Sequence, residues 1–148
     1  MRTVADILAS KTKPANIISP HAMVVDALHM MKTLNLSYVI VMDGDKLEGI
    51  FSERNYSRQV ALEGKSSATC PVRDAMTTGL AEVTPEHTVE ECIHMILGST
   101  GRYLPVLENE RLVGVITIHD ILREALRSKE ALFDSGLTDR LIEEGAIY

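Results

Sequence analysis

Residues 103–120 read YLPVLENERLVGVITIHD, and residues 38–55, which lie 65 positions earlier, read YVIVMDGDKLEGIFSERN. Each stretch contains two apolar runs separated by a short polar segment, which is the pattern of a β-hairpin. The second run ends in a hydroxyl residue, Ser52 or Thr117, and a polar residue, Asn55 or Asp120, follows three positions later. This order predicts a hairpin whose second strand leads directly into a helix.

The similarity between the two stretches extends well beyond the hairpins. Residues 18–60 align with residues 83–125 without a gap, and the first residues of the chain echo the segment that begins at residue 71. The identical pairs include residue types that chance rarely matches: Pro20 with Pro85, His29 with His94, Tyr38 with Tyr103, Gly49 with Gly114 and Arg58 with Arg123. The chain therefore contains an internal repeat.

Each repeat predicts the same elements in the same order. A short helical piece (residues 3–9 or 71–76) precedes a brief apolar segment (17–18 or 81–83), and an amphipathic helix follows at residues 24–34 or 89–97. The hairpin and a closing helix, which begins near Glu53 or Ile118, complete a β-α-β-β-α repeat. We therefore expect an α/β (α+β) fold with small sheets packed against helices. A single repeat is too small to bury its own sheet face, so we expect two repeats packed face to face about a pseudo-twofold axis.

The repeat also sets the expected domain limits. Residues 1–64 form the first motif, the small and polar residues 65–70 form a connector, and residues 71–128 form the second motif. Residues 129–148 form a C-terminal tail, which we expect to be helical because apolar residues recur along it.

Composition and charge restrict the class of protein. The chain has 148 residues and a formal net charge of −6, which opposes a general affinity for nucleic acid. No run approaches the ~18 apolar residues of a membrane span, and the N-terminus does not resemble a secretory signal. Cys70 and Cys92 have no metal-ligand or disulfide spacing and are typical of reduced thiols. We therefore expect a cytoplasmic protein that binds neither nucleic acid nor membrane.

The two strand-to-helix junctions are the strongest candidates for ligand contact. A helix N-terminus presents unpaired N–H groups and attracts a phosphate, and a carboxylate one turn later accepts hydrogen bonds from ribose hydroxyls. Nearby positive charge comes from four arginines: Arg54, Arg58, Arg102 and Arg123. The same spacing is also a common helix cap, and the pattern alone favours the cap. Its duplication in both repeats is what favours a ligand site.

The motifs RYLPV (102–106), LVGVITIHD (112–120) and GIFSERNYSR (49–58) resemble those of a tandem cystathionine-β-synthase-type (CBS) domain pair, or Bateman module. The resemblance extends from Thr3 to about Arg127. It implies adenosine ligands (AMP, ADP, ATP, NAD or S-adenosylmethionine) in the clefts between the motifs. It also implies small proteins that associate as homodimers and that have no catalytic cofactor.

The resemblance also implies roles for individual residues. It implies that Thr117 contacts phosphate, that Asp120 contacts the ribose, and that the backbone near Thr84 and at residues 103–105 lines the base pocket. The positions assigned to the second motif are Thr84, Arg102, Tyr103, Leu104, Pro105, Thr117, His119 and Asp120. The positions assigned to the first motif are Ser19, Tyr38, Val39, Ser52, Arg54, Asn55 and Arg58. Asn55 departs from the usual Asp, so the first motif is expected to bind a different ligand, to bind weakly or to bind nothing.

These features lead to a functional prediction with two alternatives. The chain is predicted to be a non-catalytic regulatory module that senses an adenine nucleotide, and its effector protein is not identified by the sequence. One alternative is a dimerisation scaffold with vestigial, empty clefts. The other is a small enzyme that acts on nucleotides, although the chain lacks a nucleophile–base pair and any spacing of metal ligands.

Overall fold

The structure is a computed structural model that describes residues 2–98 and 101–127, and the chain divides into two compact units. Unit 1 combines Met1–Lys13 with Ala81–Tyr148, and unit 2 is Pro14–Leu80. The segment that precedes the first strand of each repeat, residues 1–13 or 71–80, is here called its leading segment. Each leading segment packs with the other repeat, so the compact units differ from the chain-order limits expected from the sequence. The expected helical tail, residues 129–148, lies outside the described residues.

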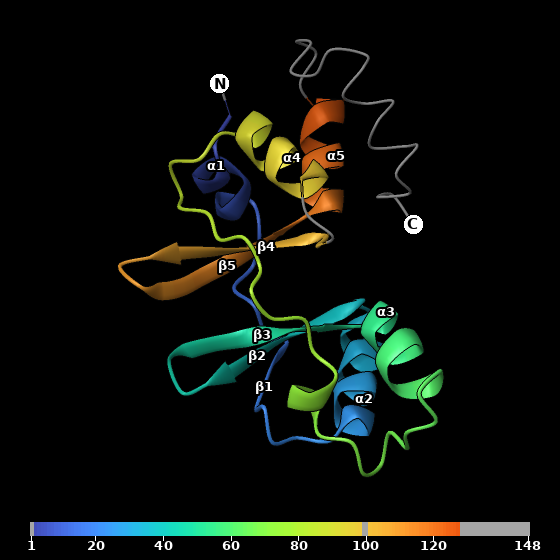
Figure 1. Ribbon diagram of the computed structural model, residues 1–148. Coiled ribbons are helices and arrows are strands. Elements are labelled where there is room, and N and C mark those ends of the chain that lie inside the picture. Colours follow the sequence, from blue (N-terminus) through green and yellow to red (C-terminus); the bar gives the residue numbers. More distant parts are fainter. Residues whose placement is uncertain (1, 99–100, 128–148) are drawn as a thin grey trace. The chain divides into compact units, whose positions relative to one another are not determined.

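Unit 2 contains a three-stranded sheet with the order β1-β2-β3 (Figure 1). Strand β1 (Ile17–Ile18) pairs in parallel with β2 (Tyr38–Asp43), and β2 pairs antiparallel with β3 (Lys46–Ser52). Helix α2 (Val24–Leu34) connects β1 to β2 and buries Val24, Ala27 and Met31, which share one helical face. After β3 the chain forms α3 (Glu53–Asn55), a π-helical segment η1 (Tyr56–Ala61) and, from the leading segment, a 3-10 turn η2 (Val72–Asp74).

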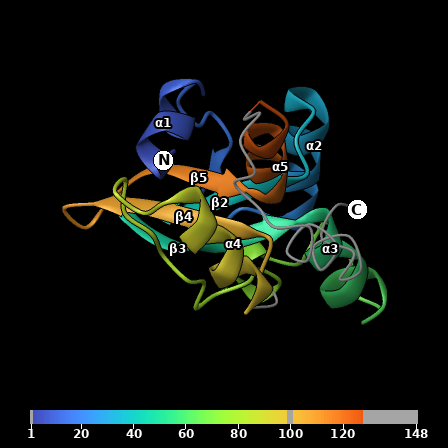
Figure 2. The ribbon, with the colours of Figure 1, turned by 90° about the horizontal axis from the view of Figure 1, so that it is seen from above.

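Unit 1 contains the two-stranded hairpin of β4 (Tyr103–Glu108) and β5 (Arg111–Thr117). The segment 81–83, expected as a strand, is reduced to a single parallel bridge between Val83 and Val106. The helices α1 (Val4–Ala9), α4 (Val89–Leu97) and α5 (Ile118–Arg127) lie on the same face of this hairpin (Figures 1 and 2). Helix α1 comes from the leading segment of the first repeat, and α4 and α5 come from the second repeat.

The two hairpins share an irregularity that supports the repeat. The register of β2 against β3 shifts between Val41 and Met42, and the register of β4 against β5 shifts between Val106 and Leu107. These positions are equivalent in the sequence alignment, and a bulge of this kind increases the local twist of a hairpin. The two hairpins are therefore equivalent in this backbone detail as well as in sequence.

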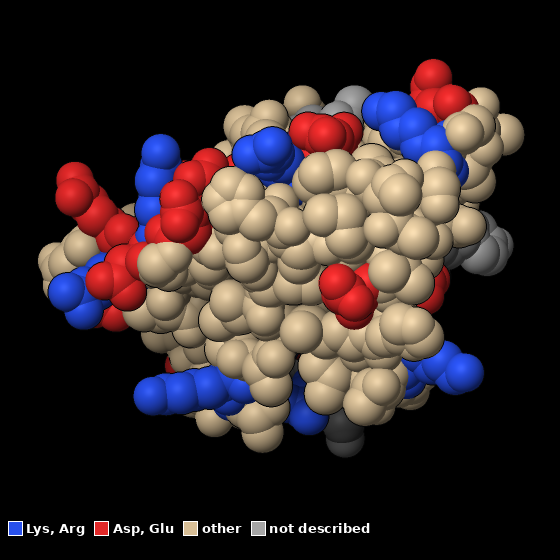
Figure 3. Space-filling model, turned by 90° about the horizontal axis from the view of Figure 1, so that it is seen from below, with Lys and Arg blue, Asp and Glu red and all other residues tan. Residues whose placement is uncertain are grey.

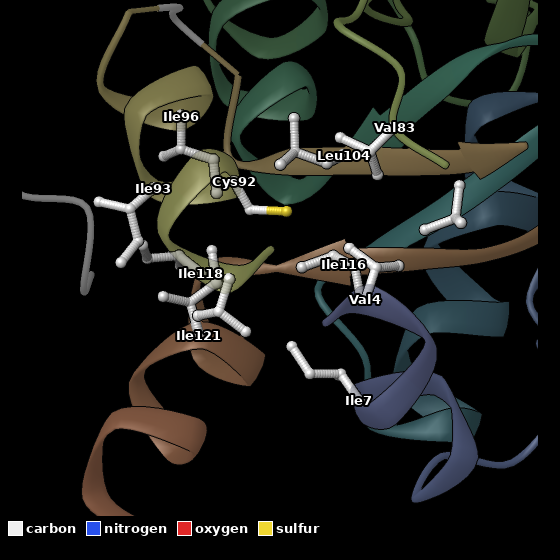
Figure 4. Close-up of a cluster of buried hydrophobic side chains, with 12 residues drawn as sticks. Val4, Ile7, Val83, Cys92, Ile93, Ile96, Leu104, Ile116, Ile118 and Ile121 are labelled. Atoms are coloured by element: carbon white, nitrogen blue, oxygen red, sulfur yellow. The ribbon is translucent and has the colours of Figure 1, made fainter. Parts of the chain in front are cut away.

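Each unit has its own aliphatic core. In unit 1 the side chains of α1, α4, α5 and the hairpin converge, as Figure 4 shows for Val4, Ile7, Cys92, Ile116 and Ile121. In unit 2 the core joins residues of all three strands to α2 and to the leading segment: Ile18, Val24, Ala27, Met31, Val39, Val41, Phe51, Val60, Cys70, Val72 and Ala75. Because full burial of one such aliphatic side chain stabilises by about 1.5–3 kcal/mol, each leading segment is a substantial part of its unit's core.

Three local expectations need correction. The closing helix of the first repeat has only three α-helical residues before it widens into η1, and the helix expected at 71–76 is only the turn η2. Cys70, which the sequence placed in a plain connector, is buried in the core of unit 2, and Ser67 and Cys70 accept backbone hydrogen bonds from the first turn of α2. Cys92 is also buried, and this burial raises the pKa of its thiol to about 11.

The surface agrees with the mixed charge of the sequence. On the face shown in Figure 3, acidic and basic side chains are interspersed near the edge, and uncharged atoms fill the centre. That arrangement is unlike the continuous basic surface by which proteins hold a phosphate backbone. Among the described residues, no helix combines the length and the apolar character that crossing a membrane requires.

The matched glycines of the repeat are explained by the leading segments. A Cβ atom at Gly49 would lie 2.5 Å from the backbone oxygen of Thr77, and one at Gly114 would lie 2.6 Å from Cδ2 of Leu8. In each unit, the leading segment therefore crosses the second strand of the hairpin at the position where the strand has no side chain. The neighbour of Gly49 is backbone and is held by reciprocal hydrogen bonds between Ile50 and Thr77, whereas the neighbour of Gly114 is the end of a flexible side chain.

This difference predicts unequal costs for one substitution at two equivalent sites. We expect Gly49→Ala to lower the free energy of unfolding by about 2–3 kcal/mol, because backbone must move to admit the methyl group. Gly114→Ala should cost about 1 kcal/mol or less, because Leu8 can change rotamer. Urea denaturation of both variants measures the difference. An equally small loss of stability in both variants would show that the crossing does not constrain Gly49.

Candidate functional site

The junction of β5 and α5 is closed by reciprocal hydrogen bonds between Thr117 and Asp120. The backbone N–H of Thr117 donates to Oδ2 of Asp120 over 2.9 Å, and the backbone N–H of Asp120 donates to the Thr117 hydroxyl over 3.2 Å. This geometry is a capping box, so the helix-cap interpretation of the sequence pattern is confirmed. The cap also aims both side chains at the first turn of α5, where unpaired N–H groups favour an anion.

Asp120 is more than a cap, because its carboxylate is buried and bonded to two cations. Its side chain is only 3% exposed, and its Oδ2 lies 2.8 Å from Nζ of Lys11. Its Oδ1 accepts a hydrogen bond of 3.1 Å from the guanidinium of Arg123, one turn along α5. Lys11 also donates to the backbone oxygen of Val115 over 2.9 Å. The lysine therefore attaches the leading segment of unit 1 both to the C-terminal end of β5 and to the first turn of α5.

The equivalent junction in unit 2 has the same shape with neutral groups. Oδ1 of Asn55 accepts from both the backbone N–H and the hydroxyl of Ser52, each over 2.9 Å. The amide Nδ2 of Asn55 donates to the hydroxyl of Thr77 over 3.0 Å. Thr77 belongs to the other leading segment and donates its backbone N–H to Ile50, the equivalent of Val115. A carboxylate and an ammonium in unit 1 are thus matched by an amide and a hydroxyl in unit 2.

The structure places Arg102 and Tyr103 at this junction, but it does not place Thr84 there. Tyr103 pairs with Thr117 in the hairpin register, and the backbone oxygen of half-buried Arg102 accepts from the N–H of Ile118. Thr84 follows Val83, whose backbone hydrogen-bonds to Pro105 and Leu107, so Thr84 lies on the side of this contact that faces the hairpin turn and away from Thr117. The Thr84 hydroxyl lies 3.1 Å from Nδ1 of His87.

The side chains available for contact at this junction differ from residue to residue. Leu104 is 1% exposed and belongs to the core, so only its backbone is available to a ligand. Pro105 is also buried, whereas His119 is exposed on the first turn of α5.

In unit 2 the structure places Tyr38 at the junction, whereas Ser19 follows β1 on the side that faces the hairpin turn. Tyr38 pairs with Ser52 and Val39 pairs with Phe51, while exposed Ser19 follows the short strand β1. Val39 is fully buried in the core, so its side chain is not available to a ligand. Arg54 and Arg58 are exposed beside the junction, on α3 and on the π-helical segment η1 respectively. Local widening of a helix by a π-turn often accompanies a functional site.

Sequence reasoning missed Lys11 and Thr77, which complete the two junctions. Lys11 is 109 positions from Asp120 in the chain, and Thr77 is 22 positions from Asn55. Spacing within a repeat does not reveal either contact, because each of these residues comes from the leading segment of the other repeat. The substitution of Asn for Asp at position 55 was the available signal, since a neutral amide matches a hydroxyl partner and a carboxylate matches a cation.

Comparison with known proteins identifies this arrangement. The family model described as the CBS domain matches residues 4–61 and 72–127. The mitochondrial CBS domain-containing protein CBSX3 of Arabidopsis thaliana is 32% identical over 130 residues, which cover 82% of this chain and 63% of that protein. This chain therefore spans less than two thirds of the length of that relative.

Solved structures share the fold. A CBS-domain protein from Burkholderia ambifaria MC40-6 is 31% identical with a TM-score of 0.81, and the match covers 90% of this chain and 98% of that one. The structure of CBSX2 in complex with AMP has a TM-score of 0.71 at 22% identity and covers 88% of this chain and 100% of that one. At that identity the likeness to CBSX2 concerns the fold alone.

The contacts of Asp120 predict a measurable loss of stability. We expect Asp120→Ala to lower the free energy of unfolding by about 2–3 kcal/mol, because the backbone N–H of Thr117 loses its acceptor and two cations lose a buried partner. Exposed His119, the preceding residue, provides the control, and His119→Ala should change stability by less than about 0.5 kcal/mol. Chemical denaturation measures both variants. Equal, small effects would show that the buried carboxylate contributes little to the fold.

Proposed function

Because the chain belongs to the CBS-domain family, we propose that it is a non-catalytic regulatory module whose strand-to-helix junctions bind an adenine nucleotide. The observation that supports this most directly is the junction of Thr117 and Asp120. It combines a helix N-terminus, a hydroxyl, a buried carboxylate and two cations within one turn of helix. These groups match the donors and acceptors of a ribose phosphate.

Each group has a proposed role at the junction of unit 1. The Thr117 hydroxyl donates a hydrogen bond to phosphate. The N-terminus of α5 and Arg102 supply positive potential. Asp120 accepts hydrogen bonds from the ribose. The backbone of residues 103–105 and Thr84 receives the adenine, and exposed His119 lies at the edge of the site. AMP is the first ligand to test because CBSX2, a structural neighbour, has been solved in complex with AMP.

The junction of unit 2 is proposed as a second and weaker site. Ser52 and Asn55 take the places of Thr117 and Asp120, and Ser19, Tyr38 and Val39 take those of the base-pocket positions. The neutral amide of Asn55 makes weaker hydrogen bonds to ribose hydroxyls than a carboxylate does. Exposed Arg54 and Arg58 add two positive charges, which suit a ligand with a second phosphate group such as ADP, ATP or NAD.

Calorimetry with AMP, ADP, ATP, NAD and S-adenosylmethionine tests this function. We expect AMP to bind, and we expect Asp120→Asn to weaken AMP binding by about tenfold, because hydrogen bonds to a charged acceptor contribute roughly 1.5–3 kcal/mol. Asp26, an exposed carboxylate in the first turn of α2, gives a matched control. Asp26→Asn should bind AMP as the unmodified chain does.

Two other results would contradict the proposal in different ways. Steady conversion of a bound nucleotide would indicate an enzyme. If the protein is folded and none of the five ligands raises its melting temperature, the result would favour a ligand-free scaffold. A ligand that binds only the native state must raise that temperature. One observation favours the scaffold as the second candidate: among the described residues, no buried side-chain nitrogen or oxygen atom lacks a hydrogen-bond partner. The junctions are therefore satisfied by the chain's own groups.

A homodimer is also part of the proposal. Leu62 and Leu126, near the ends of the two closing helices, are 81% and 86% exposed, which is unusual for large aliphatic side chains. Covering them in a subunit contact would remove apolar surface from water. We expect sedimentation velocity to give about twice the monomer mass of 16.3 kDa. A single monomeric species at all protein concentrations would contradict the homodimer and leave the nucleotide proposal standing.

A further inference from the structure

We propose that Lys11 is a positioning residue for the nucleotide site of unit 1, and that it makes that site selective for ribose over deoxyribose. The inference rests on the proposed function and adds a residue outside the motifs of the junction. It starts from one contact, the 2.8 Å ion pair between Nζ of Lys11 and Oδ2 of Asp120. The lysine comes from the leading segment and holds a carboxylate that belongs to the first turn of α5.

The number of acceptor positions on Asp120 determines what Lys11 does. Each oxygen of an ionised carboxylate accepts about two hydrogen bonds. Oδ2 already receives two, from the backbone N–H of Thr117 and from the Lys11 ammonium. Oδ1 receives one, from the guanidinium of Arg123, whose side chain is 57% exposed and free to change rotamer. The contacts on Oδ2 therefore fix the plane of the carboxylate and leave Oδ1 as the oxygen that receives ribose hydroxyls.

The positive charge of Lys11 supports the same role as its position. The Asp120 side chain is almost fully buried, so its negative charge would repel a phosphate group bound at the same helix N-terminus. The Lys11 side chain is 27% exposed, and its ammonium compensates that charge at close range. Its second bond, to the backbone oxygen of Val115, holds the ammonium at the junction beside Oδ2 of Asp120. Lys11 thus allows a carboxylate that binds ribose to lie beside a site for phosphate.

Unit 2 shows the same construction without the charges. Asn55 is neutral and needs no compensating cation, and the partner supplied by the leading segment is the hydroxyl of Thr77. Both Ser52 donors converge on Oδ1 of Asn55, so the oxygen of that amide is already occupied. A ribose at the junction of unit 2 would have to share this oxygen with Ser52, which agrees with the weaker site proposed there. Selection for ribose is assigned to the pair of Lys11 and Asp120 in unit 1.

The experiment compares AMP with 2′-deoxy-AMP by calorimetry. The variants are Lys11→Met, which removes the charge and keeps the side-chain length, Lys11→Arg, which keeps a cation, and Asp120→Asn, which identifies the site. Exposed Lys13, two positions along the same segment, gives the matched control Lys13→Met. Circular dichroism and thermal melting of each variant establish that it is folded under the conditions of the titration.

We expect the unmodified chain to prefer AMP over 2′-deoxy-AMP by about tenfold, since one hydrogen bond to a charged group is lost. Lys11→Met should weaken AMP binding by about five- to tenfold and reduce the preference to about twofold or less. Lys11→Arg should restore part of the preference, and Lys13→Met should change neither quantity. In the double variant Lys11→Met with Asp120→Asn, AMP affinity should equal that of Asp120→Asn alone, because Lys11 acts through Asp120.

The outcomes separate this inference from the function on which it rests. If the unmodified chain binds none of the nucleotides, the proposed function fails and the role of Lys11 falls with it. If the chain binds AMP but Lys11→Met keeps the full preference for ribose, the role of Lys11 alone is overturned. Tighter AMP binding by Lys11→Met would also overturn it, because the lysine would then compete with the ribose.

Discussion

The packing of each leading segment against the other repeat is the constraint on which the rest of the structure depends. Gly49 and Gly114 mark the two crossings, where a single added carbon would meet Thr77 or Leu8. The same segments contribute Val4 and Ile7 to one core and Val72 and Ala75 to the other. Neither repeat therefore completes its hydrophobic core from its own continuous stretch of chain. Each repeat instead contributes its leading segment to the core of the other repeat.

This exchange also determines the chemistry of the candidate sites. Both strand-to-helix junctions are local structures built by capping, but each is completed by a residue from the exchanged segment. Lys11 meets Asp120, and Thr77 meets Asn55. Both leading segments continue directly along the chain into the other unit, so each junction is hydrogen-bonded to a segment that joins the units. A ligand that prefers one arrangement of that segment would shift its population, which is the thermodynamic requirement for a regulatory module.

The different partners of the two junctions explain why residue 55 is Asn where residue 120 is Asp. An Asp120 carboxylate buried without a cation would carry an uncompensated charge, and Lys11 and Arg123 supply the compensation. In unit 2 the partner is a hydroxyl, and an amide satisfies it without any charge. The residue at the third position after the cap therefore matches the chemistry of the exchanged segment. One sequence repeat thus supports two sites with different electrostatics.

The sequence alone determined the features that depend on short-range order. The repeat, the two hairpins, the amphipathic helices and the caps at Ser52 and Thr117 could all be predicted, because alternation, helical period and capping involve residues a few positions apart. Only the tertiary structure decided which leading segment joins which core, that Cys70 is buried, and that Lys11 and Thr77 complete the junctions. Such contacts depend on burial and on partners far away in the chain, and no local pattern around Lys11 encodes a carboxylate 109 positions later.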